Sequence, residues 1–285
     1  MRKKLHIVVL LIIPFSFFIV TYTVPFFYGI SVSFHSPKGD FIGISNYLLI
    51  FRDARFLNAI KYSLVFSAST TVSLVLFGLI FGIVIHHLNY GRSIVKTAIL
   101  IPWAISMTVW GLLAQIVLHD HFGLVNFLLL KLGIIRQGIG WLSDPALARF
   151  SAIAVRVYRE VWFGSLLFLS ARQIIPEEFY DEARVSGARP SQTLWFVTLP
   201  ILKPTVLYIA TLVLIFSFQE FDLVFALTQG GPGFATELAS ITVFQLGVRY
   251  GKFEYGTAAI TVWSLFVTTI VVIFFRFFGR KLRDQ

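Results

Sequence analysis

Long apolar runs constrain this chain more than any other feature of its sequence. They recur along the chain at lengths of about 20 residues, and a helix of that length crosses the hydrocarbon core of a bilayer. The 285 residues are 57% hydrophobic and 13% charged, and a soluble domain carries about twice that charged fraction. The sequence therefore predicts an all-α, polytopic integral membrane protein.

The hydropathy pattern predicts six transmembrane helices. They are expected at 7–33, 61–86, 95–118, 149–171, 204–228 and 257–278. No long polar block separates them, so we expect one transmembrane domain over 1–285. The first run is too long for a signal peptide and lacks a small-x-small cleavage site, so we interpret it as an uncleaved span.

Basic residues set the expected orientation of these spans. Arg2, Lys3 and Lys4 precede the first span, and Arg280 and Lys281 follow the last. Lysine and arginine gather on the cytoplasmic side of membrane proteins. An even number of spans places both termini on one side, so we predict that both are cytoplasmic. The same pattern places the polar loop 172–203 in the cytoplasm.

Several other functions are disfavoured by the sequence. The net charge of +10 fits membrane-flanking loops better than nucleic-acid binding. The chain has no Cys, no phosphate-binding G-x-x-x-x-G-K-[ST] loop and no H-E-x-x-H or G-x-S-x-G motif. His119 and His121 stand at i and i+2, which do not share a helical face. We therefore predict no metal site, no cofactor and no enzymatic activity in this chain.

A polar elbow interrupts the apolar sequence within 172–203. The segment 181–187 reads D-E-A-R-V-S-G. Gly187 is placed to end a helix, because glycine tolerates the left-handed conformation that closes many helices, and Pro190 can begin another. Such an elbow indicates a surface that another protein binds. The alternative is an ordinary charged loop between two spans.

This segment resembles the EAA cytoplasmic loop of binding-protein-dependent ABC importers. In that family E-A-A is followed after three residues by Gly, and after nine more by I-x-L-P. The corresponding positions here are Asp181, Glu182, Ala183, Gly187, Val197, Leu199 and Pro200. The spacing fits throughout. Asp181, Glu182 and Val197 depart from the usual Glu, Ala and Ile, and Ser186 from a common Asp.

Two further motifs extend the resemblance over nearly the whole chain. Residues 41–47 look like the F-x-G-L-x-N-Y entry of the carbohydrate-uptake group of these permeases. Residues 228–233, followed by Thr236, look like the T-x-G-G-P turn of the first permease subunit of that group, the maltose-F-type (MalF-like) half.

The resemblance implies the type I importer permease (MetI-like) fold, in a multi-pass subunit of the inner or plasma membrane. It implies a second permease subunit as a heterodimer partner, two ATPase subunits that bind ATP and Mg, and an extracellular solute-binding protein. The loop residues that it assigns to ATPase coupling are Asp181, Glu182, Ala183, Gly187, Leu199 and Pro200.

Charged residues inside a span are costly and by default indicate function. On the fourth span Arg156, Glu160 and Phe163 share a helical face with Arg159 beside them, and on the fifth span Phe216, Ser217 and Glu220 form a second stripe. Aromatic rings stack on the C–H face of a sugar, and polar groups bind its hydroxyls. The resemblance places these positions at the sugar-lining positions of maltose-type permeases, which predicts a sugar or polyhydroxyl substrate.

Alternatives remain open at this point. Arg156 and Glu160 could form an i,i+4 ion pair that only neutralises the span, or they could serve with Glu220 in an ion-coupled secondary transporter. Asp222 could face the pathway or another helix. Trp103 and Ser106 are candidate lining residues from family position alone. Disaccharides, oligosaccharides, polyols and glycerol-3-phosphate all remain possible substrates.

Overall fold

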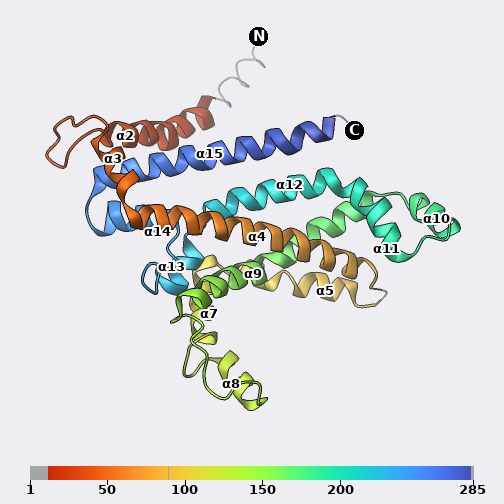
Figure 1. Cartoon of the computed structure of the whole chain (residues 1–285). Coiled ribbons are helices and arrows are strands. Elements are labelled where there is room, and N and C mark those ends of the chain that lie inside the picture. The colour runs from red at the N-terminus through yellow and green to blue at the C-terminus, as the bar shows by residue number, and fades with distance from the viewer. Residues whose placement is uncertain (1–11, 89, 284–285) are drawn as a thin grey trace, which may run out of the picture. The chain divides into compact units, whose positions relative to one another are not determined.

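The computed structural model describes residues 12–88 and 90–283 (Figure 1). The start of the expected span 7–33 and the basic residues Arg2, Lys3 and Lys4 lie outside this description. The described structure is helical, as predicted, with one isolated β-bridge between His35 and Phe41. The chain divides into two compact units: a first unit of Met1–Asn58 with Thr242–Phe266, and a second unit of Ala59–Ile241 with Val267–Gln285.

The helices have the following bounds. In chain order they are α2 (Val24–Val32), α3 (Ser45–Arg52), α4 (Ala54–His86), α5 (Arg92–Ala98), α6 (Ile101–Ala104), α7 (Met107–Val117), α8 (Leu124–Lys131), α9 (Pro145–Ile174), α10 (Glu178–Val185), α11 (Pro190–Thr193), α12 (Leu199–Phe218), α13 (Asp222–Thr228), α14 (Ala239–Phe244) and α15 (Phe253–Arg283). Three π-helical turns, Ile19–Thr23, Leu194–Thr198 and Gln245–Arg249, adjoin α2, α12 and α14.

Four of the described helical segments are long and apolar enough to cross a bilayer. They are Ile12–Val32, Ala54–His86, Pro190–Phe218 and Phe253–Arg276. The 30-residue helix α9 also has the length of a span, but its charged residues lower its hydropathy.

The expected span 95–118 is not one continuous helix. Its two halves, Ser93–Ala104 and Met107–Val117, meet at a bend of 93°. Ile105 has an extended backbone there, and the Ser106 hydroxyl accepts the Val109 N–H at 3.3 Å to cap α7. Ser106 therefore has a structural role at the bend, where hydropathy alone predicted an unbroken helix.

The expected span 204–228 also needs correction, because it contains two helices. The first helix begins earlier, at Pro190, and ends at Phe218. After a break, α13 begins at Asp222, and the Glu220 carboxylate accepts the Leu223 N–H at 3.0 Å in its first turn. Hydropathy missed this break because apolar residues continue on both sides of it.

Helices α4 and α9 pack closely through small residues. A Cβ atom added at Gly82 would lie 2.9 Å from the Phe168 Cβ and 2.9 Å from the Ser165 carbonyl oxygen, and one at Gly78 would lie 3.3 Å from the Gly164 carbonyl carbon. Gly78 and Gly82 form a G-x-x-x-G pair, a spacing that lets two membrane helices approach closely. This contact fixes α9 against α4 in the part of α9 that follows its charged residues in the sequence.

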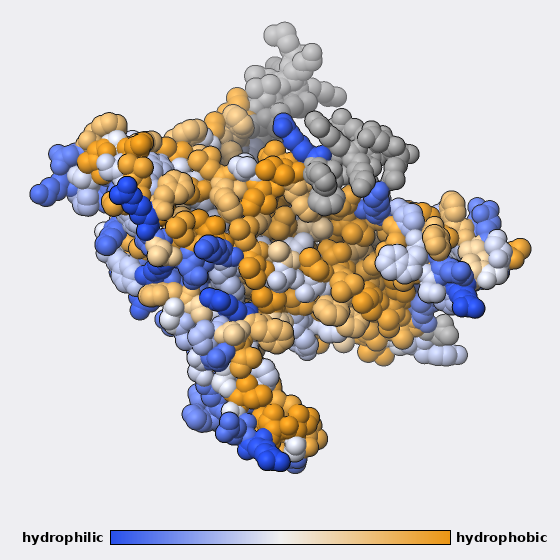
Figure 2. Space-filling model, viewed as in Figure 1, coloured by the Kyte–Doolittle hydropathy of each residue, from blue (hydrophilic) through white to orange (hydrophobic). Residues whose placement is uncertain are grey.

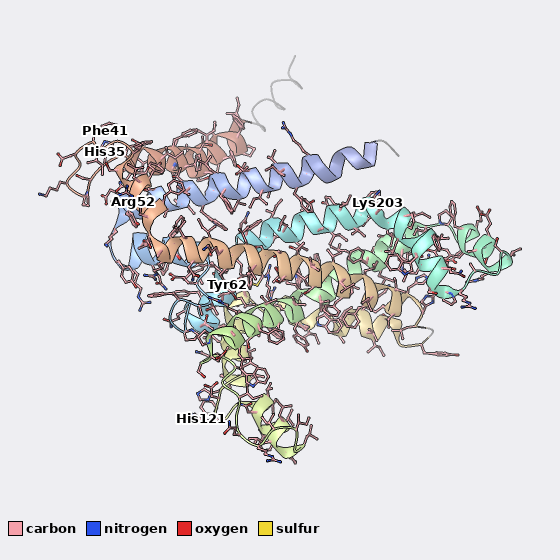
Figure 3. The ribbon with its side chains drawn as sticks, in the orientation of Figure 1. His35, Phe41, Arg52, Tyr62, His121 and Lys203 are labelled. Atoms are coloured by element: carbon pink, nitrogen blue, oxygen red, sulfur yellow. The ribbon has the colours of Figure 1, made fainter. Side chains whose placement is uncertain are left out.

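The opposite end of α9 is held by a buried apolar cluster. Its members include Tyr62 and Phe66 from α4 and Leu223, Val224 and Leu227 from α13. Figure 3 labels Tyr62 on α4, and its hydroxyl also donates to the Arg149 carbonyl at 3.3 Å. In this way α13, which follows the break after α12, is fixed beside α4 and α9.

Hydrophilic residues gather over the short helix α10, while hydrophobic residues cover most of the long helices (Figure 2). Helices α10 and α11 lie together at one end of α9 and α12, and α8 projects near the other end of α9 (Figure 1). The structure therefore separates the polar loop 172–203 from the segment that carries α8.

The motif at 41–47 organises a loop in the first unit. The Asn46 side chain is buried and donates to the carbonyls of Ser33 and His35 at 2.8 and 3.0 Å. The Tyr47 hydroxyl lies 2.6 Å from that of Ser33. Asn and Tyr in this motif therefore satisfy backbone and side-chain groups at the end of α2.

Candidate functional site

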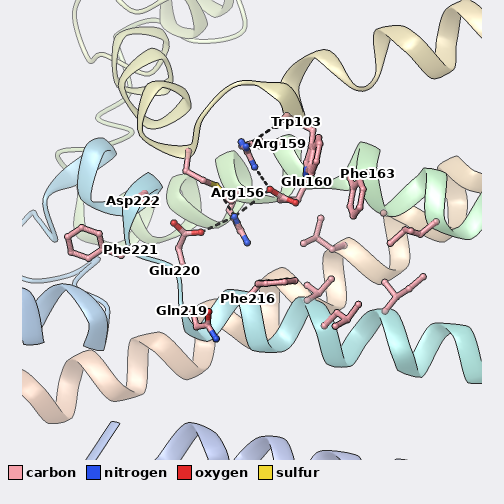
Figure 4. Close-up of a pocket in the computed structure, with 17 residues that line it drawn as sticks. Trp103, Arg156, Arg159, Glu160, Phe163, Phe216, Gln219, Glu220, Phe221 and Asp222 are labelled. Atoms are coloured by element: carbon pink, nitrogen blue, oxygen red, sulfur yellow. Dashed lines mark hydrogen bonds and ion pairs between the residues drawn. The ribbon is translucent and has the colours of Figure 1, made fainter. Parts of the chain in front are cut away.

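A cavity of about 570 Å³ lies in the second unit, and it collects most of the predicted pathway residues (Figure 4). Helix α9 supplies one wall, the end of α12 and the following break supply another, and the bend before α7 contributes a third. The predicted residues that line it are Trp103, Arg156, Arg159, Glu160, Phe163, Phe216, Glu220 and Asp222.

An ion pair joins two of these walls. The Arg156 guanidinium on α9 lies 2.9 Å from the Glu220 carboxylate in the break after α12, and 3.6 Å from Glu160 one turn along α9. The side chains of Arg156 and Glu220 are only 4% and 3% exposed. The i,i+4 pair that the sequence suggested is therefore the longer contact, and the shorter one links residues on different elements.

Arg159 is held by the bent segment. Its guanidinium donates to the carbonyls of Trp103 at 3.0 Å and Ile105 at 2.6 Å, and it is also paired with Glu160. At the bend the backbone carbonyls do not accept hydrogen bonds from within a helix, so they need other N–H donors. Arg159 supplies these donors, which anchors the bend to α9.

The charges in this cluster balance one another. Arg156 and Arg159 face Glu160 and Glu220, which suits a buried site, because a buried charge without a partner is strongly destabilising. One donor is left over: the buried Nε of Arg156 has no hydrogen-bond partner among the described residues. The four charges of this cluster therefore sum to zero, and one buried N–H within it makes no hydrogen bond to a described residue.

Aromatic rings complete the cavity. Trp103 and Phe163 stack in parallel, with ring centroids 4.9 Å apart and an interplanar angle of 10°. Phe216, on α12, is 59% exposed and also lines the cavity. Figure 4 shows these rings on different elements around the charged cluster. The cavity thus combines flat apolar faces with polar groups.

Ser217 does not line this cavity. It is 2% exposed, and its hydroxyl accepts a hydrogen bond from Thr70 on α4 at 3.0 Å. The residue following Phe216 on a helix points about 100° away from it, so the two cannot share one face. The lining residues that were not selected from the sequence include Met107 and Gln219. Gln219 stands three residues after Phe216 and so shares its helical face, a spacing from which Gln219 could have been predicted to line the cavity.

The elbow at Gly187 has the geometry of a Schellman helix ending. Gly187 has φ +74°, the Ala188 N–H donates to the Ala183 carbonyl at 2.9 Å, and the Gly187 N–H donates to the Arg184 carbonyl at 3.0 Å. Asp181 and Glu182 are exposed on α10, and Asp181 pairs with Arg184 at 3.0 Å.

The base of this elbow is packed against the start of α12. Tyr180 is buried, and its hydroxyl lies 3.1 Å from that of Thr198. Leu199 and Pro200 are the first two residues of α12. The exposed face of α10 is therefore connected by a fixed contact to a long apolar helix, which is the mechanical requirement for a coupling element.

The two histidines considered for metal binding have another arrangement. His119 stacks on Phe122 with ring centroids 3.5 Å apart, and its Nδ1 accepts the His121 N–H at 3.2 Å. Among the described residues, no three His, Asp or Glu side chains are grouped in a way that could hold a metal ion.

Residues 74–284 match the model of a protein family described as "Binding-protein-dependent transport system inner membrane component". A trehalose/maltose transport system permease protein from Thermococcus litoralis is 28% identical over 87% of this chain and 83% of its own length. A glycerol-3-phosphate transport system permease from Agrobacterium fabrum is 26% identical over 84% of this chain and 80% of its own length.

The fold is also similar to solved structures. A chain of a bacterial ABC transporter that imports the acidic polysaccharide alginate superposes with a TM-score of 0.88. The alignment covers 98% of this chain and 96% of that one, at 22% sequence identity. A chain of a bacterial alginate transporter in complex with its pentasaccharide-bound periplasmic protein gives a TM-score of 0.86 at 22% identity, over 96% of this chain and 93% of that one.

Proposed function

Because this chain belongs to the family of binding-protein-dependent transport system inner-membrane components, we propose that it forms half of a translocation pathway for a sugar or related polyhydroxyl solute. The chain is a multi-pass, inner-membrane permease of an ABC importer, and thus a transport component rather than an enzyme. This family membership argues against the alternative of an ion-coupled secondary transporter.

The cavity on α9 and α12 supports the proposed substrate class. Its arginine and glutamate side chains are paired with one another. With Asp222 also in the lining, the cavity has no excess of positive charge that would favour an anion. Its Trp and Phe rings offer faces for the C–H groups of a sugar, beside the polar groups of the charged side chains. The two relatives above are named for maltose or trehalose and for glycerol-3-phosphate, which all carry hydroxyl groups.

The proposed topology has six spans. Four helical segments qualify by length and hydropathy, the bent pair around Ile105 is a fifth, and α9 is the sixth. The neutralisation of its charges against Glu220 supports α9 as a span. The lysine and arginine distribution supports cytoplasmic termini and a cytoplasmic loop 172–203.

The proposed partners follow from this topology. Two ATPase subunits bind ATP and Mg and dock on α10, whose exposed Asp181 and Glu182 can pair with basic residues of a groove. The contact of Tyr180 with Thr198 transmits the movement of α10 to α12. A second permease subunit supplies the other half of the pathway, and an extracellular solute-binding protein delivers the solute.

The experiment is an uptake assay in cells that lack the gene for this chain. A panel of radiolabelled disaccharides, oligosaccharides, polyols and glycerol-3-phosphate is offered, and uptake is restored with the wild-type gene or with Glu220→Gln. We expect one sugar or related polyhydroxyl solute of the panel to depend on the wild-type gene, and Glu220→Gln to reduce its uptake per subunit present in the membrane. Dependence of no solute in the panel on the wild-type gene, or full activity of Glu220→Gln, would contradict the proposal.

A further inference from the structure

A second cavity, of about 500 Å³, lies beside the elbow at Gly187, and we call it the loop pocket. The end of α4 supplies His86 and His87, the end of α9 supplies Arg172, α10 supplies Arg184, and the start of α11 supplies Ser191. Among the described residues that line it, none is Asp or Glu. The loop pocket is therefore basic, and its lining comes from four different helices of one unit.

Arg172 is held in position within the loop pocket. Its side chain is 8% exposed, and its guanidinium lies 3.6 Å from the centre of the Tyr180 ring. Its carboxylate contact is Glu177, at 3.5 Å, whose side chain is 61% exposed. A close charge-assisted hydrogen bond measures about 2.7–2.9 Å, so this pair is loose. A buried, oriented guanidinium thus retains donors for another acceptor.

The other basic groups are adjustable. Arg184 pairs with Asp181 on the surface, with side chains 74% and 65% exposed, and such exposed pairs contribute little stability. The rings of His86 and His87 are perpendicular neighbours, with centroids 5.3 Å apart. An imidazole ring carries an N–H that can donate to an anion in either protonation state.

We propose that the loop pocket binds a phosphate-type oxyanion, which is either the headgroup of an anionic lipid or free phosphate. Arginine guanidinium groups match the oxygens of a phosphate in pairs, and basic pockets at the ends of membrane helices accept lipid headgroups. A bound oxyanion joins the end of α4 to Arg172 and to Arg184 on α10. The bound oxyanion therefore holds the elbow at Gly187 in place beside α4, at a site separate from the solute cavity.

The absence of Cys from this chain allows a local test. Ser191→Cys places one thiol in the wall of the loop pocket, and Ser186→Cys places one on the nearby exposed end of α10, outside the lining. Each variant is purified in its complete importer complex, and the rate of maleimide modification is read on this subunit. The probes are dioctanoyl phosphatidylglycerol, inorganic phosphate and, as the zwitterionic control, dioctanoyl phosphatidylcholine.

We expect an anionic probe to slow modification at Ser191→Cys at least fivefold in a saturable manner, and to leave Ser186→Cys within twofold. Protection by the lipid alone identifies a headgroup site, and protection by phosphate alone or by both identifies a site for the free ion. Absence of protection by either anion overturns the proposal. No transport is measured, so this failure is distinct from failure of the proposed function.

Charge-matched variants complete the test. Arg184→Gln removes a lining cation, and Arg189→Gln removes an exposed one from the same loop that does not line the pocket. Loss of a charge-assisted contact predicts that about tenfold more ligand is needed for half-protection. We expect that shift for Arg184→Gln and no shift for Arg189→Gln. Equal protection in these two variants overturns the proposal.

Discussion

The Arg156 guanidinium and the Glu220 carboxylate lie 2.9 Å apart and are both buried, which joins α9 to the break between α12 and α13. The same carboxylate also accepts the Leu223 N–H at 3.0 Å. Glu220 therefore neutralises the buried Arg156 and also accepts a hydrogen bond from the first turn of α13. A change in the charge of Glu220 should thus also affect the position of the cavity wall at the start of α13.

This pairing predicts a non-additive effect of substitution. Arg156→Gln and Glu220→Gln each leave one buried charge with weaker compensation, which costs about 3 kcal/mol. The double variant removes both charges, and we expect it to recover about 1–3 kcal/mol of the summed loss. Thermal unfolding of the purified complex measures this, with the exposed Glu178→Gln as the control. Strict additivity would show that the two residues do not act as a pair.

Neighbouring residues on α12 should separate solute binding from packing. Phe216 is exposed in the cavity, whereas Ser217 is buried against Thr70. We expect Phe216→Ala to lower uptake at subsaturating solute by about 2- to 10-fold, since an aromatic stacking contact contributes about 0.5–1.5 kcal/mol. Ser217→Ala should keep the same half-saturation concentration. The assignment fails if the two variants have equal half-saturation concentrations.

The elbow should depend on the backbone conformation of residue 187. Gly187 has φ +74°, and a Cβ added there would meet nothing within 4 Å. A side chain therefore introduces backbone strain of about 1–2 kcal/mol without a steric clash. We expect Gly187→Arg to abolish uptake while the subunit still reaches the membrane, and Gly187→Asn to retain most activity because Asn tolerates this conformation. Uptake and immunoblots of membranes measure both, and wild-type uptake by Gly187→Arg would refute the coupling role.

The contact between α4 and α9 should be sensitive to a single methyl group. At Gly82 an added Cβ would lie 2.9 Å from Phe168 and from the Ser165 carbonyl, whereas at Gly29 the nearest atom is 4.0 Å away. We expect Gly82→Ala to destabilise the protein by about 1–3 kcal/mol and Gly29→Ala to be neutral. Comparison of their thermal unfolding midpoints tests this expectation. Equal unfolding midpoints would mean that α4 and α9 can move apart to accommodate the methyl group without loss of stability.

Sequence reasoning identified what depends on local pattern. The apolar runs predicted a helical membrane protein, and the spacing from Asp181 to Pro200 indicated the family that the match to 74–284 establishes. The Gly187 ending followed from the conformational freedom of glycine. These features can be predicted without knowing which helices pack against one another.

The features that sequence reasoning missed depend on contacts between distant residues. Hydropathy predicted unbroken spans at 95–118 and 204–228. It does not include hydrogen bonds between elements, such as the one from Arg159 to the Ile105 carbonyl, or side-chain bonds at helix starts, such as the one from the Leu223 N–H to Glu220. The role of Ser217 was likewise set by Thr70, which is on another helix. The loop pocket combines residues from α4, α9 and α10, so no single motif marks it.

The ion pair between α9 and the break after α12 has a consequence for biosynthesis. Translation proceeds from the N-terminus, so Arg156 leaves the ribosome before Glu220 has been made. During that interval Glu160 is the acidic neighbour already present on the same nascent helix. The pair between Arg156 and Glu220 can therefore form only after the later segment has been made, so α9 first depends on an acidic partner within its own helix.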